Sequence, residues 1–149
     1  MTIQKIKKTE FLPYSPAKLY SLVADIERYP EFLPGCMEAR VLDEKDGEVT
    51  AELGIGYGPL EVSFVTRNRN TPGEKIEMRL VRGPFKSLEG TWSFEPRGRD
   101  ETRVRLKLVI EFAEGHIWDL FRRFGQDAAN SVMHAFTERA RSLYSSGDG

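Results

Sequence analysis

Apolar and polar residues alternate with a period of two along much of this sequence, and this pattern constrains the fold more than any other feature. In one run, Leu60, Val62 and Phe64 alternate with Glu61 and Ser63. Such alternation gives a strand one dry face and one wet face. Similar runs lie between turns that contain glycine or proline, at residues 46–47, 56–59, 70–73, 82–84 and 96–100. The spacing predicts an antiparallel meander. With residues 2–11 and 37–43, it forms a sheet of about seven strands.

Two helical regions flank the predicted sheet. Ser15 followed by Pro16 is a typical helix start, because serine caps the first turn and proline suits the first helical position. A second, short helical turn is predicted over residues 29–35, which end with Pro34 and Gly35. One long amphipathic helix is predicted from about His116 to Tyr144, which corresponds to roughly 40 Å. The sequence therefore predicts an α+β fold.

Composition narrows the classes of protein that the chain can belong to. Its 149 residues are the size of one domain, so we expect a single domain over 1–149 with a frayed tail at 145–149. A formal net charge of −1 argues against a dedicated nucleic-acid binder, and no DNA partner is expected. Cys36 is the single cysteine, which excludes an internal disulfide and a cysteine-based zinc cluster. No apolar run is long enough to span a bilayer. These features favour the cytoplasm.

Large aromatic residues gather on the predicted inner faces. Bulky rings in a small curved sheet either fill a solid core or line a cavity, and the pattern alone leaves both possibilities open. The candidates for the inside are Phe11, Phe32, Phe64, Trp92, Phe94, Phe112, Phe121, Phe124 and Phe136.

The predicted inner faces carry few ionisable residues, which argues against an enzyme. General acid–base chemistry needs carboxylates or histidines placed inside a pocket. We interpret His116 and His134 as surface histidines and Cys36 as a structural thiol. We therefore predict no catalytic residue, no metal site and no cofactor. The carboxylates of the strands alternate outward: Glu52, Glu61, Glu77, Glu89 and Glu111.

Three polar residues interrupt the apolar faces. Thr66 and Asn68 continue the inward phase of one strand, and Arg139 continues the apolar stripe of the last helix. Because buried polar groups need partners, these residues either contact the head group of a ligand or lie where the stripe meets solvent. Arginines on outward phases are interleaved with glutamates, which predicts a mixed-charge surface rather than an RNA-binding patch.

Three segments resemble a known family. Residues 29–36 read YPEFLPGC, residues 83–94 read GPFKSLEGTWSF and residues 135–140 read AFTERA. In this order they resemble motifs of the coenzyme Q-binding START-type proteins, whose bacterial members include the ribosome association toxin RatA, within the START-like polyketide cyclase (SRPBCC) superfamily. The resemblance covers nearly the whole chain. It implies the helix-grip fold, a curved antiparallel sheet around a long C-terminal helix, with two short helices after the first strand.

The resemblance also implies a cavity between the sheet and the C-terminal helix. Its expected ligand is ubiquinone or another isoprenoid lipid, bound by a quinone carrier that supports respiratory electron transport. The alternative is a toxin that blocks the association of ribosomal subunits, and a third, less favoured reading is a polyketide cyclase. Thr66, Asn68 and Arg139 are the expected polar contacts to a head group. The expected cavity residues are Phe32, Leu53, Val62, Phe64, Met78, Leu80, Phe85, Leu88, Trp92, Phe94, Leu108, Phe112, Phe121, Phe124, Ala128, Val132 and Phe136.

Two predicted loops carry apolar residues where polar turn residues are usual. One holds Phe32 and Leu33, and the other holds Pro84 and Phe85. These side chains either plug the end of the core or close the mouth of the cavity against the last helix. A lipid carrier must also touch a bilayer, so this reading includes transient membrane contact through the loops and a peripheral position at the inner membrane.

Overall fold

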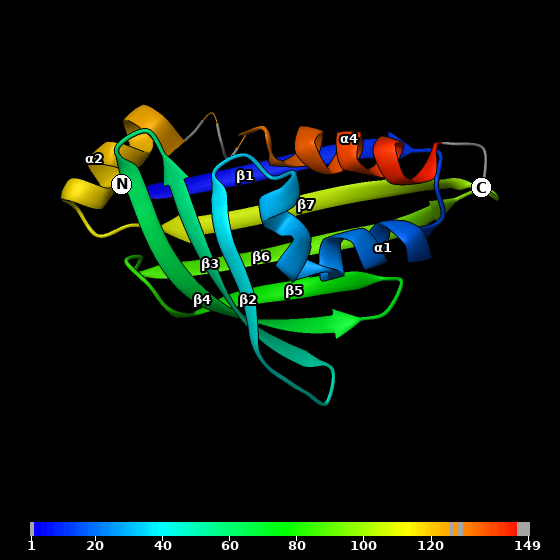
Figure 1. The fold of residues 1–149 in the computed structure, drawn as a ribbon, viewed down its shortest axis with the longest axis horizontal. Helices are drawn as coiled ribbons and strands as arrows, with labels where there is room; N and C mark the ends of the chain where they lie inside the picture. Colours follow the sequence, from blue (N-terminus) through cyan, green and yellow to red (C-terminus); the bar gives the residue numbers. More distant parts are fainter. Residues whose placement is uncertain (1, 126, 128–129, 146–149) are drawn as a thin grey trace.

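A seven-stranded antiparallel sheet dominates the computed structural model, which describes residues 2–125, 127 and 130–145. The order of the strands is β1-β7-β6-β5-β4-β3-β2, so every strand except β1 lies beside its neighbour in sequence (Figure 1). The predicted meander is confirmed. The strands are β1 (Ile3–Leu12), β2 (Cys36–Lys45), β3 (Glu48–Tyr57), β4 (Leu60–Thr71), β5 (Lys75–Arg82), β6 (Ser87–Arg97) and β7 (Glu101–Glu111).

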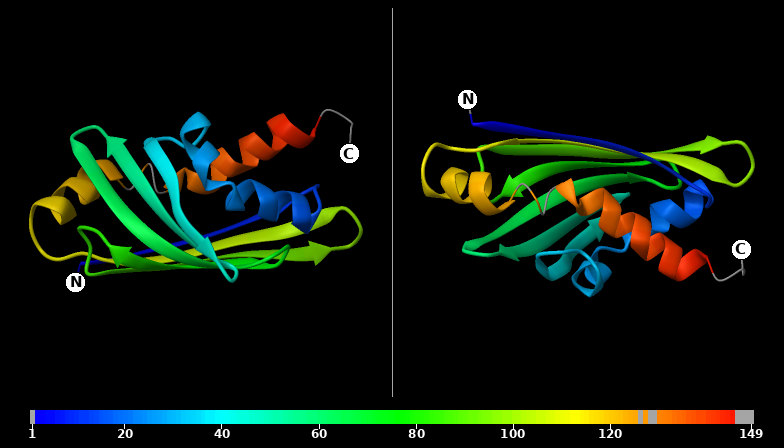
Figure 2. Two further views of the ribbon diagram at one scale, coloured as in Figure 1. Left: turned by 60° about the horizontal axis from the view of Figure 1, so that its bottom comes forward. Right: turned by 90° about the horizontal axis from the view of Figure 1, so that it is seen from above.

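The register of the strands places the apolar residues on one face. Leu53 of β3 lies opposite Phe64 of β4, and Leu88 of β6 lies opposite Ile110 of β7. The sheet curves strongly, and the helices lie on its concave side (Figure 2). Buried apolar residues of the strands pack in one cluster with residues of α1 and α4. Irregular pairing accompanies this curvature, with register shifts in β2 and between Val65 and Thr66 of β4, as β-bulges bend and twist a strand.

Short helices cover the concave face. They are α1 (Pro16–Ala24), the 3-10 helix η1 (Ile26–Glu31) and α4 (Val132–Tyr144) (Figure 2). The predicted start of α1 is confirmed, because the Ser15 side chain accepts a hydrogen bond from the Lys18 backbone N–H at 3.3 Å. The second helical turn differs from the prediction. It precedes residues 32–35 instead of including them, and the chain leaves it through Gly35, whose φ of 82° suits glycine.

The prediction of one continuous helix from His116 to Tyr144 is wrong. The structure has a short α2 (His116–Leu120) and then a π-helical segment η2 (Phe121–Gly125) (Figure 1). Asp127 and Asn130 are helical, Ser131 is a turn, and α4 begins after it. Glycine is a poor helix former, and Gly125 lies at the end of η2. The 13 residues of α4 correspond to about 20 Å, half the predicted length.

The first strand carries a large aromatic residue that the sequence analysis assigned to the wrong face. Phe11 is 49% exposed, whereas the next residue, Leu12, is buried. Period-two alternation explains the difference, because adjacent residues of a strand face opposite sides. The Phe11 ring instead lies under the Arg97 guanidinium, 5.4 Å from the ring centroid.

The C-terminal end of α4 is attached to the sheet rather than free. The hydroxyls of Tyr14 and Ser145 share a hydrogen bond of 2.5 Å, and the Tyr14 carbonyl accepts one from Thr102 Oγ1 at 2.7 Å. Ser145 is the first residue of the predicted frayed tail, and the others, 146–149, lie outside the described residues.

We expect Ser15→Ala to lower the free energy of unfolding by about 1 kcal/mol, because α1 loses its N-cap. Urea denaturation followed by circular dichroism measures the change. Ser21→Ala in the same helix is the matched control, since Ser21 is exposed and should change stability by less than about 0.5 kcal/mol. Equal effects of the two substitutions would contradict the capping role.

Candidate functional site

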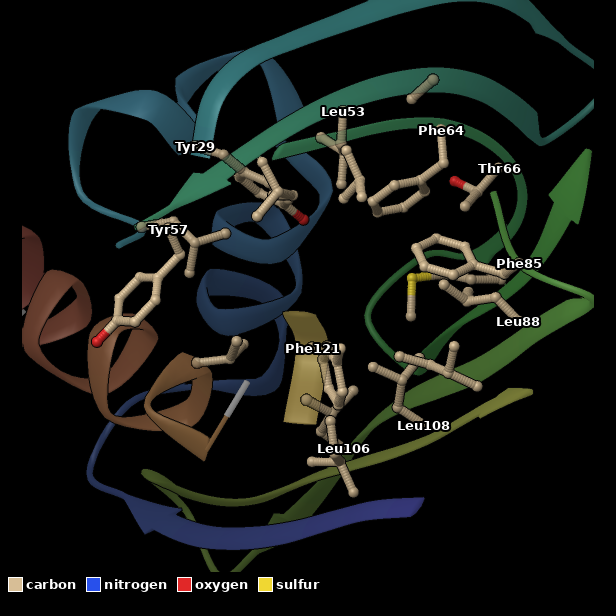
Figure 3. A pocket seen from close by; sticks show the side chains of 18 of the residues that line it. Tyr29, Leu53, Tyr57, Phe64, Thr66, Phe85, Leu88, Leu106, Leu108 and Phe121 are labelled. Atoms are coloured by element: carbon tan, nitrogen blue, oxygen red, sulfur yellow. The ribbon is translucent and has the colours of Figure 1, made fainter. Parts of the chain in front are cut away.

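An apolar cavity of about 210 Å³ lies between the concave face of the sheet and the helices (Figure 3). Strands β3, β4, β6 and β7 contribute most of its wall. The rest comes from single residues of β1 and β5, from the helices η1, α2, η2 and α4, and from the loops next to β2, β6 and β7. Pro34, in the turn between η1 and β2, lines the cavity and is also exposed to solvent.

The cavity separates two clusters of buried side chains. The larger cluster includes Trp92 and Phe136, whose ring centroids are 5.0 Å apart in an edge-on arrangement. The smaller cluster includes Phe112 and Phe121, whose ring centroids are 4.8 Å apart. All four rings also line the cavity. The sequence left open whether the aromatic residues fill a core or line a cavity. They do both, because each ring packs within a buried cluster and also lines the cavity.

Most of the predicted cavity residues lie together around this space. Phe85, from the loop before β6, turns inward and packs edge-on against Phe64 and Phe112. Leu33 also lines the cavity, as does Phe121. The predicted residues that line it are Leu53, Val62, Phe64, Met78, Phe85, Leu88, Trp92, Leu108, Phe112, Phe121, Val132 and Phe136.

Three predicted apolar residues do not line the cavity. Phe94 is fully buried beside it and stacks on Trp92. Leu80 packs against the smaller cluster. Phe32 packs edge-on against Tyr29 and Phe136, so its ring joins η1 to α4 instead of facing the space. The side chain of Phe124 and residue Ala128 lie outside what the structure describes.

Arg139 is not at the cavity, which corrects its prediction as a head-group contact. Its Nη2 donates to Glu31 Oε1 at 2.7 Å, and its guanidinium lies 5.0 Å from the Phe32 ring centroid. Because η1 packs against α4 here, the residue that interrupts the helix stripe meets an acidic residue of η1. Its role is to hold η1 and α4 together.

Thr66 and Asn68 both line the cavity and are both only 5% exposed. The alternative that they lie where the strand meets solvent is therefore wrong. Thr66 Oγ1 donates a hydrogen bond to Asn68 Oδ1 at 2.9 Å. Thr66 appears on the cavity wall beside Phe64 and Phe85 (Figure 3).

Several lining residues were not in the predicted set. Tyr29, Leu33 and Pro34 come from the segment around η1, which has no simple periodicity. Ile6 and Tyr57 come from the weakly alternating first strand and from a turn-like sequence. Ile26 and Ile117 come from η1 and α2. The other missed residues lie on the inward phase of strands, so counting by two from the predicted ones would have found them: Ala51, Ile55, Leu60, Leu106 and Ile110.

Among the lining residues that the structure describes, none carries a carboxylate, an imidazole, an ammonium or a guanidinium group. The Tyr29 hydroxyl is fully buried and donates to the Val23 carbonyl, and burial raises the pKa of this phenol. Tyr57 directs its hydroxyl away from the space, toward α4 (Figure 3). The arrangement can hold an apolar molecule, and it supplies no group that titrates near neutral pH. The described residues also contain no group of side chains that could hold a metal ion.

The convex face of the sheet is charged. Arg69 Nη2 lies 3.5 Å from Glu48 Oε2, and Arg40 forms an ion pair with Glu52. Arg67 of β4 lies directly opposite Arg79 of β5 in the register. A shallow depression between these side chains also includes Glu77, Glu89 and Lys107. The expected mixed-charge surface is confirmed, and like charges also face each other on it, since Lys7 of β1 lies opposite Lys107 of β7.

Comparison with known proteins identifies the family. The family model described as polyketide cyclase / dehydrase and lipid transport matches residues 12–137. The chain belongs to this family. No described helix is long and apolar enough to cross a membrane.

Curated relatives of this family member fall into two groups. The chain is 38% identical over 145 residues to the persistence and stress-resistance toxin PasT of Escherichia coli O6:H1, covering 97% of this chain and 92% of that one. It is 39% identical over 139 residues to the ribosome association toxin RatA of Pseudomonas aeruginosa, covering 93% and 96%. The mitochondrial coenzyme Q-binding protein COQ10 of Dictyostelium discoideum is 30% identical over 142 residues, covering 93% and 69%.

Solved structures confirm the helix-grip fold of this lipid-transport family. The solution structure of the 18 kDa protein CC1736 from Caulobacter crescentus is 34% identical, with a TM-score of 0.71, and covers 96% of this chain and 99% of that one. The Zhui aromatase/cyclase from Streptomyces sp. R1128 has a TM-score of 0.83 at 14% identity, covering 97% and 98%. At that identity the second similarity shows the fold alone.

We expect Cys36 to resist alkylation in the native protein. The residue is buried, its Sγ lies 3.5 Å from the Glu38 carbonyl, and burial raises the pKa of the thiol. Both access and the thiolate fraction are therefore reduced, so iodoacetamide at neutral pH should react about tenfold or more slowly with the native protein than with the urea-unfolded protein.

Mass spectrometry follows this labelling over time. A variant with Cys36→Ser and Met37→Cys is the matched control, because Met37 is 68% exposed. Its native and unfolded rates should be similar. If native wild type reacted as fast as that control, Cys36 would be an accessible thiol rather than a structural one.

Proposed function

We propose that this protein binds an apolar ligand in the cavity between the sheet and the helices. The observation that carries the proposal is a space of about 210 Å³ lined almost entirely by aliphatic and aromatic side chains. Ligand sites are typically concave, mostly apolar and largely preformed. Each square ångström of apolar ligand surface removed from water contributes about 25 cal/mol, so an apolar ligand needs few polar contacts.

The size of the cavity limits what enters it. Its volume of about 210 Å³ is below the range of about 300–1,000 Å³ common for ligand pockets. A ring-sized group fits, whereas a long isoprenoid chain must extend beyond the cavity. A quinone with an isoprenoid tail is compatible with this volume if only its ring and its first isoprene units lie inside the cavity. The relative named as a coenzyme Q-binding protein supports this ligand class.

The empty space beside Leu53 predicts how Leu53→Phe changes stability and ligand binding. Leu53 lines the cavity and points into it (Figure 3), so the larger ring fills existing space. We expect the variant to fold with a loss of stability below about 1 kcal/mol, because overpacking of a filled core costs about 1–3 kcal/mol. We also expect it to retain less ligand. Denaturation measures stability, and organic extraction followed by mass spectrometry measures lipid that copurifies.

Leu19→Phe is the matched control, since Leu19 is 2% exposed in the packed core and does not line the cavity. It should lose about 1–3 kcal/mol and keep the ligand content of the folded fraction. Absence of lipid above the level of an unrelated control protein would overturn the proposal. Equal stability losses would show that the space around Leu53 is filled.

For the cellular role we propose association with ribosomes, ahead of a role as a respiratory quinone carrier. The RatA and PasT relatives share 34–39% identity with this chain, compared with 30% for the coenzyme Q-binding relative. The convex face adds physical support. Arg67 lies directly opposite Arg79, and no ion pair to either is present among the described residues. Adjacent like charges destabilise a sheet, whereas phosphate between them would be stabilising.

We expect the purified protein to pellet with bacterial ribosomes through a sucrose cushion at low salt, and to be released steeply as salt rises. Replacing Arg67 and Arg79 together by serine should weaken pelleting and reduce the salt dependence, because two phosphate contacts are lost. Gel densitometry of the pellets against salt concentration measures both effects.

The matched control replaces Arg28 and Arg141 by serine. It removes the same charge from residues that pair with Asp25, Glu31 and Glu138 instead. This control should pellet like wild type. If wild type fails to pellet at low salt, the ribosome proposal is wrong, and if both double variants weaken equally, the convex face is not the contact surface.

That the protein is not an enzyme stays a prediction, as does its location in the cytoplasm. A cyclase of this fold would need an acid or a base inside the cavity, and the lining described above supplies neither carboxylate nor imidazole. This composition supports the non-catalytic proposal. Transient membrane contact during ligand uptake is part of the same proposal.

A further inference from the structure

The sheet is split at one end between β5 and β6. Their pairing ends at Arg79 and Glu89. Beyond this pair, β5 continues to Arg82, and β6 already begins at Ser87. The same register would pair Val81 with Ser87, but the structure, which describes both strands in full, has no such pair. We call this split the β5–β6 fork.

Each strand of the fork is held by its other neighbour. The pairing of β5 with β4 skips Val81, which lies between Leu80 and Arg82, and a β-bulge of this kind bends its strand. On the other side, β6 stays with β7, since the Lys86 backbone N–H donates to the Glu111 carbonyl at 2.8 Å. The fork is therefore part of how the sheet is built and not a frayed end.

The Phe85 side chain closes the fork from inside. The chain before it passes so close to β4 that a Cβ on Gly83 would lie 2.6 Å from the Cβ of Phe64, so this position needs glycine. Phe85 then turns inward beside Phe64 (Figure 3). Its ring centroid is 5.4 Å from that of Phe64, on β4, and 5.3 Å from that of Phe112, just after β7. The ring thus bridges the strands on the two sides of the fork.

Little separates the cavity from the outside at the fork. A depression lies on the outer side, and Phe85 and Leu88 line both this depression and the cavity. Leu88 is 5% exposed and lies on β6, whereas Phe85 is half-buried and lies in the loop before β6. Because side chains at the surface change rotamer rapidly, rotation of the Phe85 side chain would join the two spaces.

The rim of the fork is basic and partly apolar. The cations that line the depression are Arg79, Arg82 and Lys86. Glu89 is the one carboxylate among the described residues that line it. None of the ion pairs found in the described part of the chain includes any of the three cations. Val81 is 41% exposed and Pro84 is also exposed, so apolar side chains lie among the cations.

This combination fits an anionic lipid bilayer better than a nucleic acid. Anionic head groups attract basic residues next to a membrane, and exposed apolar side chains enter the boundary between head groups and acyl chains. The phosphate backbone of RNA would match the cations but would offer nothing to Val81 and Pro84. A bilayer also brings dissolved apolar molecules directly to the fork.

We propose that the rim of the β5–β6 fork docks on an anionic lipid bilayer, and that an apolar ligand passes between the bilayer and the cavity through the fork when the Phe85 ring swings aside. This inference rests on the proposed apolar-ligand function and adds the contact surface and the route to the cavity.

Flotation with lipid vesicles tests the docking surface. We expect wild type at low salt to float with vesicles of phosphatidylcholine and phosphatidylglycerol in equal parts, and not with vesicles of phosphatidylcholine alone. Arg82→Ser combined with Lys86→Ser should lower the affinity about tenfold or more, since each basic residue near such a surface contributes about a factor of five. Arg79 stays unchanged in this fork variant, because the proposed ribosome contact also uses it.

The matched control for flotation combines Lys45→Ser with Arg99→Ser. It removes the same charge from exposed residues of two other hairpins, β2–β3 and β6–β7. This control should float like wild type.

The rate at which an apolar probe enters the protein tests the route. N-phenyl-1-naphthylamine is uncharged and fluoresces in apolar surroundings, so stopped-flow fluorescence gives its association and dissociation rate constants. We expect Phe85→Ala to raise the association rate constant about tenfold, because entry no longer waits for the ring to move. A ring that merely lined the cavity would change dissociation instead.

Phe32→Ala is the matched control for the route, since Phe32 packs between η1 and α4 outside the cavity. It should leave the association rate constant unchanged. If Phe85→Ala does not fold, Phe85→Leu keeps more of the apolar packing and should show the same change more weakly.

The outcomes separate this inference from the function on which it rests. If wild type does not float with anionic vesicles, or if the fork variant floats like wild type, the docking surface is wrong. If the fork variant floats normally but no longer pellets with ribosomes, the rim contacts RNA instead. If Phe85→Ala leaves association unchanged, or if Phe32→Ala speeds it equally, the route is wrong while apolar binding stands. If wild type does not bind the probe, both the inference and the proposed function are overturned.

Discussion

The concave face of the sheet is mostly apolar and must be covered, and this requirement organises the rest of the molecule. Seven strands at about 4.8 Å spacing make a sheet about 29 Å wide before curvature. The 13 residues of α4 form a cylinder about 20 Å long and about 10 Å across. One such helix covers a minor part of the face. The helices α1 and η1 cover more of it (Figure 2), and the part that remains is the cavity.

Aromatic side chains keep this uncovered part from collapsing. Rings such as Phe112 and Phe136 are rigid, and each is held edge-on by other rings of its own cluster. To close the space, the two clusters would need to approach each other, which would require further curvature of strands that are already paired on both sides. The side-chain packing that stabilises the fold is therefore in the two clusters, and the fold keeps the cavity between them.

The sheet and most of the cavity wall could be predicted from the sequence, because period-two alternation is a local signal. Ser15 and Pro16 identified the start of α1 for the same reason. The failures share a different cause. Where Arg139 meets Glu31, and where Phe32 turns toward Phe136, the contacts join residues more than 100 positions apart, and no local pattern encodes them. The length of the last helix was overestimated because an apolar stripe with a period of 3.6 continues across residues that are not one helix.

The position of β1 in the sheet has a consequence for how the chain folds during synthesis. Strands β2 to β7 are joined in sequence, so each can pair with its predecessor as it leaves the ribosome. The first strand pairs only with β7, with Ile3 opposite Glu111. At a synthesis rate of about 5–20 residues per second, this strand waits about 5–20 s for its partner. During that time it is an unpaired edge, and such edges aggregate. The strand carries three positive charges, on Lys5, Lys7 and Lys8. Their repulsion keeps unpaired β1 strands of different chains apart until β7 has been synthesised.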